Sequence, residues 1–267
     1  MTPQELDTWL KSEIAAFPGR VSLLMVDLKR GEALHAVEPD AVVPAASTIK
    51  VPILLAAMEA VERKELALST PVEVPEGAIL PDTTVFEPGN RRPAYPLLEL
   101  LYWMITVSDN TAANVLIDLL GMDAVNGLCR RWGAEHTCLR RKMLDFVAQA
   151  AGRENCTTAR DQYALYAGLW RRCRGDHPKQ CWMLALDTLL RQRCQDAFLR
   201  YLNGPSPTVA HKTGGLDHVH HDAGIFQTAW GDYYLGCFTW EGPSLDGEPE
   251  QAQFLGRVGR QFYEVYS

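Results

Sequence analysis

Ser47 and Lys50 are the first residues whose types and spacing could do chemistry. They stand three positions apart, after Pro44-Ala45-Ala46 and before an apolar run, so we expect them on one face of a helix N-terminus. A serine hydroxyl becomes a nucleophile when a neighbouring base takes its proton, and an amine desolvated beside other cations can be that base near neutral pH. The simpler interpretation of Ser47 is a helix N-cap.

Ser108, Asp109 and Asn110 form a second polar group. They interrupt an apolar helical pattern over residues 97–120, so we expect them at a junction between two helices. The Ser108 hydroxyl could relay a proton, and the Asn110 amide could hold an amide of a substrate. The simpler interpretation is a cap in which Asp109 binds backbone amides of the second helix.

A third group, Lys212-Thr213-Gly214-Gly215, precedes the strands predicted near the C-terminus. Glycines allow a backbone to approach a ligand closely, and a lysine supplies positive charge. The same residues are also compatible with the ordinary start of a strand.

The elements that must position these groups follow from hydrophobic periodicity. After a predicted N-terminal helix, apolar runs predict strands at 21–28, 33–37, 223–229 and 233–240, and a last helix at 252–266. The first two strands are expected to pair antiparallel through a turn at 29–32. Between these ends the pattern is helical at 51–61, 97–120 and 163–170, with Thr158 at a helix start and a long loop at 133–157.

This arrangement predicts two lobes. Residues 1–44 and 194–267 would form an α/β lobe from both ends of the chain, and residues 45–193 would form an inserted all-helical lobe. A cleft between lobes is a common place for a site.

In this order the three groups match the motif set Ser-x-x-Lys, Ser-Asp-Asn and Lys-Thr-Gly of serine β-lactamases and penicillin-binding proteins. The chain resembles a class A β-lactamase almost end to end, including Ser-Asp-Asn-Thr-Ala-Ala-Asn at 108–114 and the loop that ends at Thr157-Thr158. The resemblance implies an α+β fold, in which an α/β/α sandwich with an antiparallel sheet carries an inserted all-α lobe.

The resemblance also implies roles for the motif residues. Ser47 would attack a β-lactam carbonyl, Lys50 would help remove its proton, and Ser108 would pass a proton to the departing nitrogen. The backbone amides of Ser47 and Gly215 would form an oxyanion hole. The substrate would be held at its side-chain amide by Asn110, and at its carboxylate by Lys212 and Thr213.

One loop departs from the family. Class A enzymes usually carry Arg-x-Glu-x-x-Leu-Asn, whose glutamate and asparagine hold the water that hydrolyses the acyl-enzyme. Here Met143 takes the glutamate position and Val147 the asparagine position, so neither can polarise water and deacylation is in doubt. Asp145 and Glu154 are the nearest acids, and either could replace the missing base if the loop is reshaped. The simpler interpretation of each is a solvated or structural carboxylate.

Two further positions differ from the family. Cys156 stands where an aspartate usually pairs with the loop arginine, so Arg141 is expected to lack that partner. No arginine occurs between Lys212 and Trp240, where many class A enzymes bind the substrate carboxylate, and three histidines stand there instead: His218, His220 and His221. His218 and His220 would share one face of a strand as a possible metal pair. We favour a cluster at the surface or facing the substrate, with no metal or other cofactor.

Composition limits the classes of function. The 267 residues are 47% hydrophobic and 22% charged, typical of a packed globular protein, and the net charge of -7 argues against nucleic acid and anionic membranes as partners. The longest apolar run has eight residues, fewer than the ~18 of a membrane-spanning helix. We expect a monomer that takes a small β-lactam, peptide or ester as its substrate.

The compartment is predicted from the cysteines and the N-terminus. The seven scattered cysteines favour free thiols. No signal-peptide pattern precedes the first helix, which predicts a cytoplasmic location, or a periplasmic or secreted one if a leader was removed.

Three functions remain open from the sequence. The first is a β-lactamase-like serine hydrolase acylated at Ser47. The second is a peptidoglycan-type peptidase or an esterase, which Met143 and Val147 favour. The third is a penicillin-binding sensor or inactive scaffold. Complete inactivity is disfavoured by four intact motif residues: Ser47, Lys50, Ser108 and Lys212.

Overall fold

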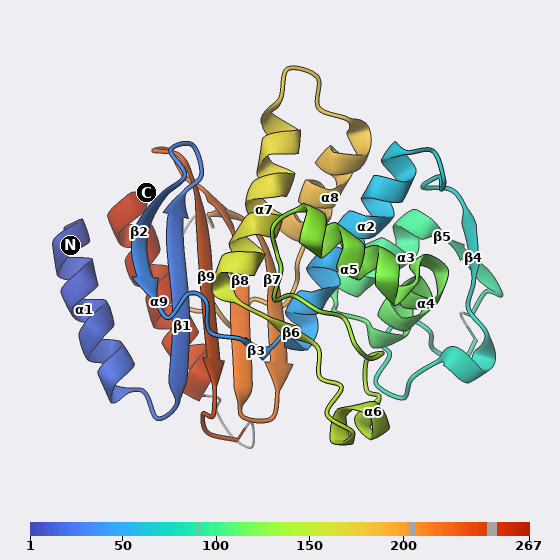
Figure 1. The fold of residues 1–267 in the computed structure, drawn as a ribbon, viewed down its shortest axis with the longest axis horizontal. Helices are drawn as coiled ribbons and strands as arrows, with labels where there is room; N and C mark the ends of the chain where they lie inside the picture. The colour runs from blue at the N-terminus through green and yellow to red at the C-terminus, as the bar shows by residue number, and fades with distance from the viewer. Residues whose placement is uncertain (90, 203–206, 245–249) are drawn as a thin grey trace.

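The computed structural model describes residues 1–89, 91–202, 207–244 and 250–267 (Figure 1). Its main strands are β1 (Arg20–Asp27), β2 (Glu32–Val37), β7 (Thr208–Leu216), β8 (Val219–Gln227) and β9 (Asp232–Trp240). They form one antiparallel sheet in the order β2-β1-β9-β8-β7. The chain therefore brings strands from both ends into one sheet, and the predicted antiparallel pairing of the first two strands is confirmed.

Helices cover both faces of this sheet. On one face lie α1 (Pro3–Ala16) and α9 (Glu250–Tyr266), and on the other lies α7 (Ala159–Arg174) (Figure 1). Strand β1 shows how the sequence makes these layers: Leu23 and Met25 pack in the core under α1 and α9, whereas Leu24 and Val26 pack in the opposite core. Successive side chains of a strand point to opposite faces, so an unbroken apolar run fits a sheet covered on both sides. The predicted α+β class with its α/β/α sandwich is confirmed.

The helical part of the chain surrounds α2 (Lys50–Glu62). Every residue of α2 from Lys50 to Met58 is buried, which explains why this apolar run has no polar face. Around α2 lie short helices and turns: η1 (Ala46–Ile49), η2 (Glu76–Ala78), α3 (Leu97–Thr106), α4 (Asn110–Leu120), α5 (Met122–Arg131) and α8 (Gln180–Leu190). In Figure 1 these helices lie to the right of the sheet.

The segment between the terminal strands also contains short strands. β3 (Val43–Pro44) pairs with β6 (Cys156–Thr157), and β4 (Pro71–Glu73) pairs with β5 (Ala94–Pro96). The interval 133–157, predicted as a long loop, contains β6 and the one-turn helix α6 (Phe146–Ala150). That prediction is wrong in these two places because α6 and β6 are each too short to show a hydrophobic period.

Strand β7 was not predicted as a strand. Its polar residues His211, Lys212 and Thr213 interrupt the alternation by which strands are recognised, yet all three are buried. The Lys-Thr-Gly motif therefore lies inside an edge strand rather than ahead of the strands.

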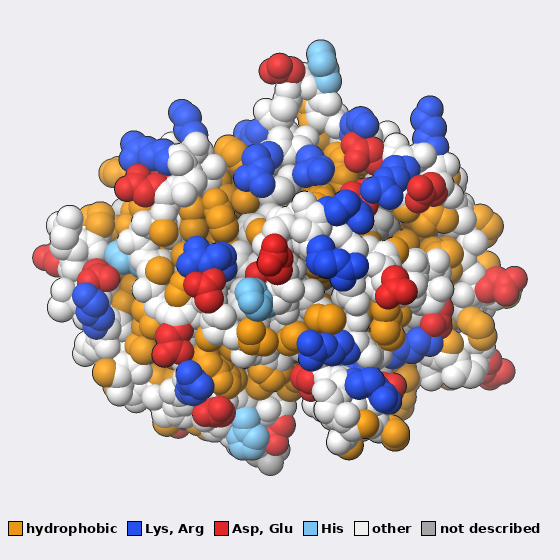
Figure 2. Space-filling view, viewed as in Figure 1, with side chains coloured by type: hydrophobic (Ala, Val, Ile, Leu, Met, Phe, Trp, Pro, Cys, Tyr) orange, Lys and Arg blue, Asp and Glu red, His pale blue; other side chains and the backbone are white. Residues whose placement is uncertain are grey.

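The surface carries charges of both signs. On the face shown in Figure 2, Lys and Arg side chains are interspersed with Asp and Glu over most of the molecule. Among the helices that the structure describes, none alone is long and apolar enough to cross a membrane. The consecutive helices α4 and α5 meet the length and composition criteria only together, as a pair bent by 84°.

Candidate active site

Ser47 lies in η1, the turn of 3-10 helix directly before α2. Its Oγ is 3.0 Å from Lys50 Nζ, across the first turn between η1 and α2. No side chain caps the backbone of α2, so the interpretation of Ser47 as a simple N-cap is wrong. Ser47 and Lys50 share one face, as their spacing predicts.

The Lys50 ammonium group is the centre of a polar cluster. Its Nζ lies 2.6 Å from Ser108 O, 3.0 Å from Ser108 Oγ and 2.6 Å from Asn110 Oδ1. The side chain has no exposed surface. Burial, together with the nearby Lys212 charge, holds the pKa of Lys50 well below its ordinary value, so Lys50 loses its proton more readily than a solvated lysine does.

Asp109 lies between two candidate functional residues, Ser108 and Asn110. Its Oδ1 accepts from the Ala112 amide at 2.7 Å and caps α4, so the capping interpretation is correct for this residue. The preceding residue, Ser108, has a φ of 58°, a conformation that non-glycine residues rarely adopt. The strained turn and the cap together direct both Ser108 and Asn110 toward Lys50.

Lys212 reaches the same serine from the sheet. Its Nζ is 3.1 Å from Ser108 Oγ and 2.8 Å from Thr213 O. Burial lowers the pKa of Lys212 to about 8. Ser108 Oγ thus lies between two buried amines. On the other side of the motif, Thr213 Oγ1 accepts from Gln192 Nε2 at 3.1 Å.

Gly214 explains how β7 can lie so close to η1. A Cβ added there would be 3.1 Å from Ser47 N, Thr48 N and Ala46 Cβ. Because glycine has no side chain, the strand backbone can lie directly against the turn that carries Ser47. Gly215 follows on the same strand and lines the cleft in front of Ser47.

The loop opposite Ser47 presents Met143 to the cleft. The Asn114 side chain holds the Met143 backbone at both ends: Met143 N donates to Asn114 Oδ1 at 2.7 Å, and Asn114 Nδ2 donates to Met143 O at 3.1 Å. Met143 is buried, whereas Val147 is 81% exposed and is not among the residues that line the cleft.

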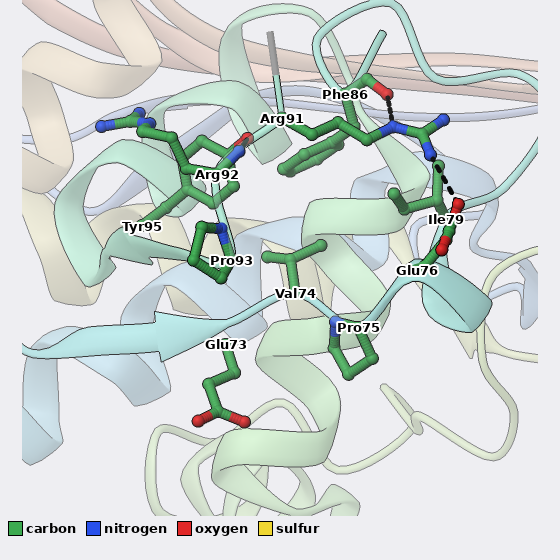
Figure 3. A pocket seen from close by; sticks show the side chains of 10 residues that line it. All are labelled: Glu73, Val74, Pro75, Glu76, Ile79, Phe86, Arg91, Arg92, Pro93 and Tyr95. Carbon is green, nitrogen blue, oxygen red and sulfur yellow. Dashed lines mark hydrogen bonds and ion pairs between the residues drawn. The ribbon is translucent and has the colours of Figure 1, made fainter. Parts of the chain in front are cut away.

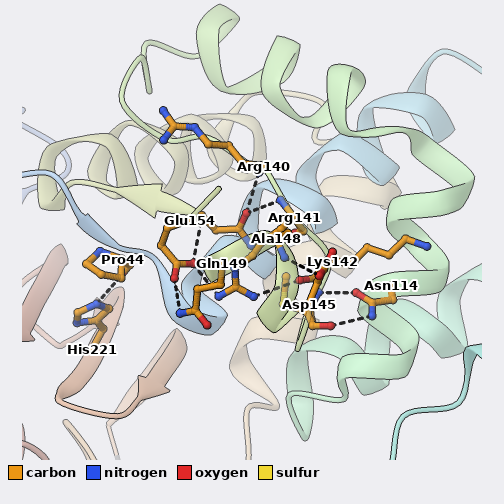
Figure 4. A network of polar contacts seen from close by, with 12 residues as sticks. Pro44, Asn114, Arg140, Arg141, Lys142, Asp145, Ala148, Gln149, Glu154 and His221 are labelled. Carbon is orange, nitrogen blue, oxygen red and sulfur yellow. Dashed lines mark hydrogen bonds and ion pairs between the residues drawn. The ribbon is translucent and has the colours of Figure 1, made fainter. Parts of the chain in front are cut away.

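Arg141 lacks the family's aspartate partner, as Cys156 predicts, but it has a different acidic partner, Glu154. Its Nε and Nη2 lie 3.0 and 2.7 Å from Glu154 Oε1, which also accepts from Asn155 N, while Gln149 Nε2 donates to Glu154 Oε2 (Figure 4). Glu154 replaces the aspartate expected at Cys156 because the loop folds back and brings it to the guanidinium. Asp145 caps α6 through Ala148 N. Both acids therefore have the structural contacts expected of them.

The cleft at Ser47 is small, about 70 Å³. Polar and apolar residues from η1, the start of α4, the loop and β7 line it: Ala46, Ser47, Asn110, Arg141, Met143, Leu144, Phe146, Glu154, Asn155, Gly215 and Leu216. Thus Ser47, Asn110 and Gly215 line one cleft, and Lys50, Ser108 and Lys212 form the polar cluster behind it.

The histidines do not form the expected cluster. β8 begins at Val219, and His218 lies in the preceding turn with a φ of 60°, so His218 and His220 do not share one strand face as the possible metal pair would require. His220 and His221 are buried rather than at the surface, because β8 lies between β7 and β9. His221 Nε2 contacts Pro44 O at 2.8 Å (Figure 4). Within the described ranges, no group of three or more His, Cys, Asp or Glu side chains is arranged to hold a metal ion.

Three contact residues are absent from the sequence prediction. Asp82 contacts Asn110, Asn114 contacts Met143, and Gln192 contacts Thr213. Asn114 lies in the quoted 108–114 context, so the motif itself contained that signal. Asp82 and Gln192 lie in loops without hydrophobic periodicity. Asp82 is 28 positions from its partner in the sequence, and Gln192 is 21 positions from its partner.

Known proteins share this architecture. The beta-lactamase regulatory protein BlaB of Streptomyces cacaoi is 26% identical over 290 aligned positions, which cover 90% of each chain. The crystal structure of a beta-lactamase from Sphaerobacter thermophilus matches with a TM-score of 0.84 and 28% identity, covering 96% of each chain. A leucine-to-glutamate mutant of PBP-A, an acyl-enzyme complex with penicillin G, matches with a TM-score of 0.83 and 28% identity, covering 98% of this chain and 96% of the other.

The sequence model of the beta-lactamase enzyme family matches residues 5–266, nearly the whole chain. The strand order, the helical part around α2 and the recognised motifs agree with this match, and so do the similar structures. The chain is class A β-lactamase-like and belongs to the beta-lactamase enzyme family.

Proposed function

We propose that this protein is a serine hydrolase of the class A β-lactamase type, acylated at Ser47 by a β-lactam or a related amide or ester. One observation carries the proposal: the buried Lys50 Nζ lies 3.0 Å from both Ser47 Oγ and Ser108 Oγ. A base within hydrogen-bond reach of both a nucleophile and a proton relay is the arrangement that acyl transfer needs.

In the proposed step, neutral Lys50 accepts the Ser47 proton as Ser47 Oγ bonds to the substrate carbonyl carbon. The carbon–nitrogen or carbon–oxygen bond then breaks, and the leaving atom takes a proton from Ser108, which Lys50 reprotonates. The backbone amides of Ser47 and Gly215 stabilise the oxyanion. The polar contacts of Lys50 and Lys212 with Ser108 Oγ support the relay.

The remaining motif residues bind substrate in this proposal. Asn110 holds the acyl-side amide, and Lys212 with Thr213 attracts the substrate carboxylate. Burial supports the role of Lys212, because a charge in a water-poor site attracts an anion more strongly than a solvated charge does.

The loop puts deacylation in doubt, and we expect the acyl-enzyme to persist. Met143 lines the cleft with a thioether that cannot take a proton from water, and Glu154 is occupied by Arg141 and Gln149. This observation favours a second candidate, a penicillin-binding sensor that is acylated once. The 26% identity to a beta-lactamase regulatory protein supports the same candidate.

Intact-protein mass spectrometry after addition of one penicillin and one cephalosporin tests the proposal, with free drug followed by absorbance. We expect a single lasting adduct on the protein, none on Ser47→Ala, and the normal adduct on Ser12→Ala, which removes an exposed serine of α1. Circular dichroism checks that Ser47→Ala is folded.

The outcomes separate the candidate functions. An adduct on Ser47→Ala refutes the nucleophile. Continuous drug loss with only a transient adduct identifies a working β-lactamase and contradicts the persistent acyl-enzyme. No adduct and no drug loss contradict acylation by β-lactams and direct attention to peptides and esters.

A further inference from the structure

Cys138 and Cys156 face each other at the base of the loop opposite Ser47. All seven cysteines of the chain carry free thiols in this structure. Two of them form a direct backbone pair: Cys138 N donates to Cys156 O at 2.9 Å, and Cys156 N donates to Cys138 O at 3.1 Å. Residues that exchange both hydrogen bonds in an antiparallel pair have Cα atoms about 5.5 Å apart and side chains on the same face.

This backbone geometry suits a disulfide. Disulfide-bonded cysteines have Cα atoms roughly 4.4 to 6.8 Å apart, and the separation in a hydrogen-bonded pair lies within that range. Opposite Cβ atoms in such a pair are about 5 Å apart, about 1 Å more than in a disulfide. A bond between the two sulfurs therefore needs only a small approach of the side chains, and the strain of that approach would keep the bond easy to reduce.

The surroundings of the two thiols differ. Cys138 is partly exposed, so a reagent in solution can reach its sulfur. Cys156 is buried, its Sγ donates to His136 O at 3.4 Å, and burial raises the pKa of its thiol. Arg140 lies beside both sulfurs, because a hydrogen bond with the Cys138 side chain and the nearby Cys156 both raise the pKa of Arg140. A cation at this place stabilises the thiolate that disulfide exchange requires.

The two cysteines also stand at the ends of a segment that forms part of the candidate site. More than half of the residues that line the cleft belong to the segment 139–155. The Arg141–Glu154 pair and the Asn155 side chain, which accepts from Arg141 N at 3.0 Å, hold this segment by noncovalent contacts. A bond between the cysteines would close the segment covalently at its base.

We propose that Cys138 and Cys156 are a modification site, at which a small disulfide such as oxidised glutathione forms a bond that holds the segment 139–155. The Cys138 thiolate attacks one sulfur of the oxidant, whose sulfur–sulfur bond breaks and releases one glutathione thiolate. Cys156 then gives up its proton and attacks the Cys138 sulfur of the mixed disulfide, which releases the second glutathione. Two protein thiols are oxidised, and one molecule of oxidant is reduced to two thiols. Neither step uses Ser47.

Peptide mapping of the intact protein tests the site. Trypsin cuts after arginine, so Cys138 falls in the peptide 132–140 and Cys156 falls in the peptide 154–160. The protein is incubated with oxidised glutathione, and the remaining thiols are blocked with iodoacetamide before digestion. We expect the two peptides to be joined and the protein to have lost two hydrogen atoms. Dithiothreitol should separate the peptides again.

Cysteine variants separate this bond from other thiol reactions. Cys156→Ser should leave Cys138 with one attached glutathione, and Cys138→Ser should leave Cys156 unreacted. Cys194→Ser removes another partly exposed thiol and should leave the joined peptides unchanged. A glutathione that stays on Cys138 of the unmodified protein overturns the proposal, and so does a bond from Cys138 to the neighbouring Cys129.

Thermal unfolding measures what the bond does to the segment. Closing a ring of this size should raise the Tm by about 5 °C. Glu154→Gln should lower the Tm about half as much in the oxidised protein as in the reduced one, because the disulfide and the Arg141–Glu154 pair hold the same segment.

Arg91 provides the matched control in a part of the chain without cysteine. Figure 3 shows its guanidinium between Phe86 O, to which Nε donates at 2.7 Å, and Glu76, 3.6 Å from Nη1, beside a separate cavity of about 580 Å³. Arg91→Gln removes these contacts and should lower the Tm equally in both redox states. If oxidation leaves the Tm unchanged, or does not reduce the loss caused by Glu154→Gln, the claim that the bond holds the segment is overturned.

Discussion

The titration of Lys212 predicts how acylation depends on pH. Its pKa is lowered to about 8 by burial, and a lysine is a cation below its pKa and neutral above it. The attraction for a substrate carboxylate is therefore present below pH 8 and lost as the pH rises above it. At pH 9 about one tenth of the molecules keep the charge, so the second-order acylation rate should fall about tenfold per pH unit from there.

The loss above pH 8 cannot come from Lys50. Its neutral form is the proposed base, so deprotonation of Lys50 raises the rate rather than lowering it. The assay is stopped-flow acylation by benzylpenicillin from pH 6 to 10. Lys212→Arg should remove the fall near pH 8, because a guanidinium stays charged over this range.

The methyl ester of benzylpenicillin is the matched control. It lacks the carboxylate, so its acylation should not follow the charge of Lys212. A rate that is level from pH 7 to 9.5 for the free acid refutes the reasoning, and so does an equal fall for the ester or for Lys212→Arg.

Two further predictions concern the loop opposite Ser47. Met143→Glu places a carboxylate at a position that lines the cleft, so the adduct on Ser47 should be hydrolysed about 10- to 100-fold faster. Mass spectrometry measures the lifetime of the adduct, and an unchanged lifetime would contradict the account of deacylation. Glu154→Gln leaves the buried Arg141 guanidinium with a neutral partner, so it should lower the free energy of unfolding by about 2 kcal/mol in urea titrations. The control variant Glu87→Gln should change this free energy little. A loss below about 0.5 kcal/mol would show that Glu154 does not hold the loop.

The convergence of Ser47, Lys50, Ser108 and Lys212 could be predicted from the sequence. Each group of residues has a simple structural interpretation, but all of them in this order match one motif set, and strands at both ends of the chain predict a single sheet. The structure joins these side chains in a row: Lys50 Nζ lies 3.0 Å from both Ser47 Oγ and Ser108 Oγ, and Lys212 Nζ lies 3.1 Å from Ser108 Oγ.

The contacts that the sequence did not predict depend on how irregular segments fold. Glu154 meets Arg141 because the loop folds back, and Asp82 reaches Asn110 from a segment without periodicity. His220 and His221 are polar residues inside a central strand, where both faces are covered. Alternation of side chains locates a strand, but it does not reveal whether the strand lies at an edge or in the middle of the sheet.

Asn114 holds residue 143 only through backbone atoms, its amide nitrogen and carbonyl oxygen. These atoms are present in every amino acid except for the proline N–H, so the path of the loop does not depend on which side chain stands there. A single codon change at this position can alter the chemistry facing Ser47 while the scaffold stays the same. Within such a scaffold, we expect a protein that keeps an acyl group and one that releases it to differ by as little as one amino-acid substitution.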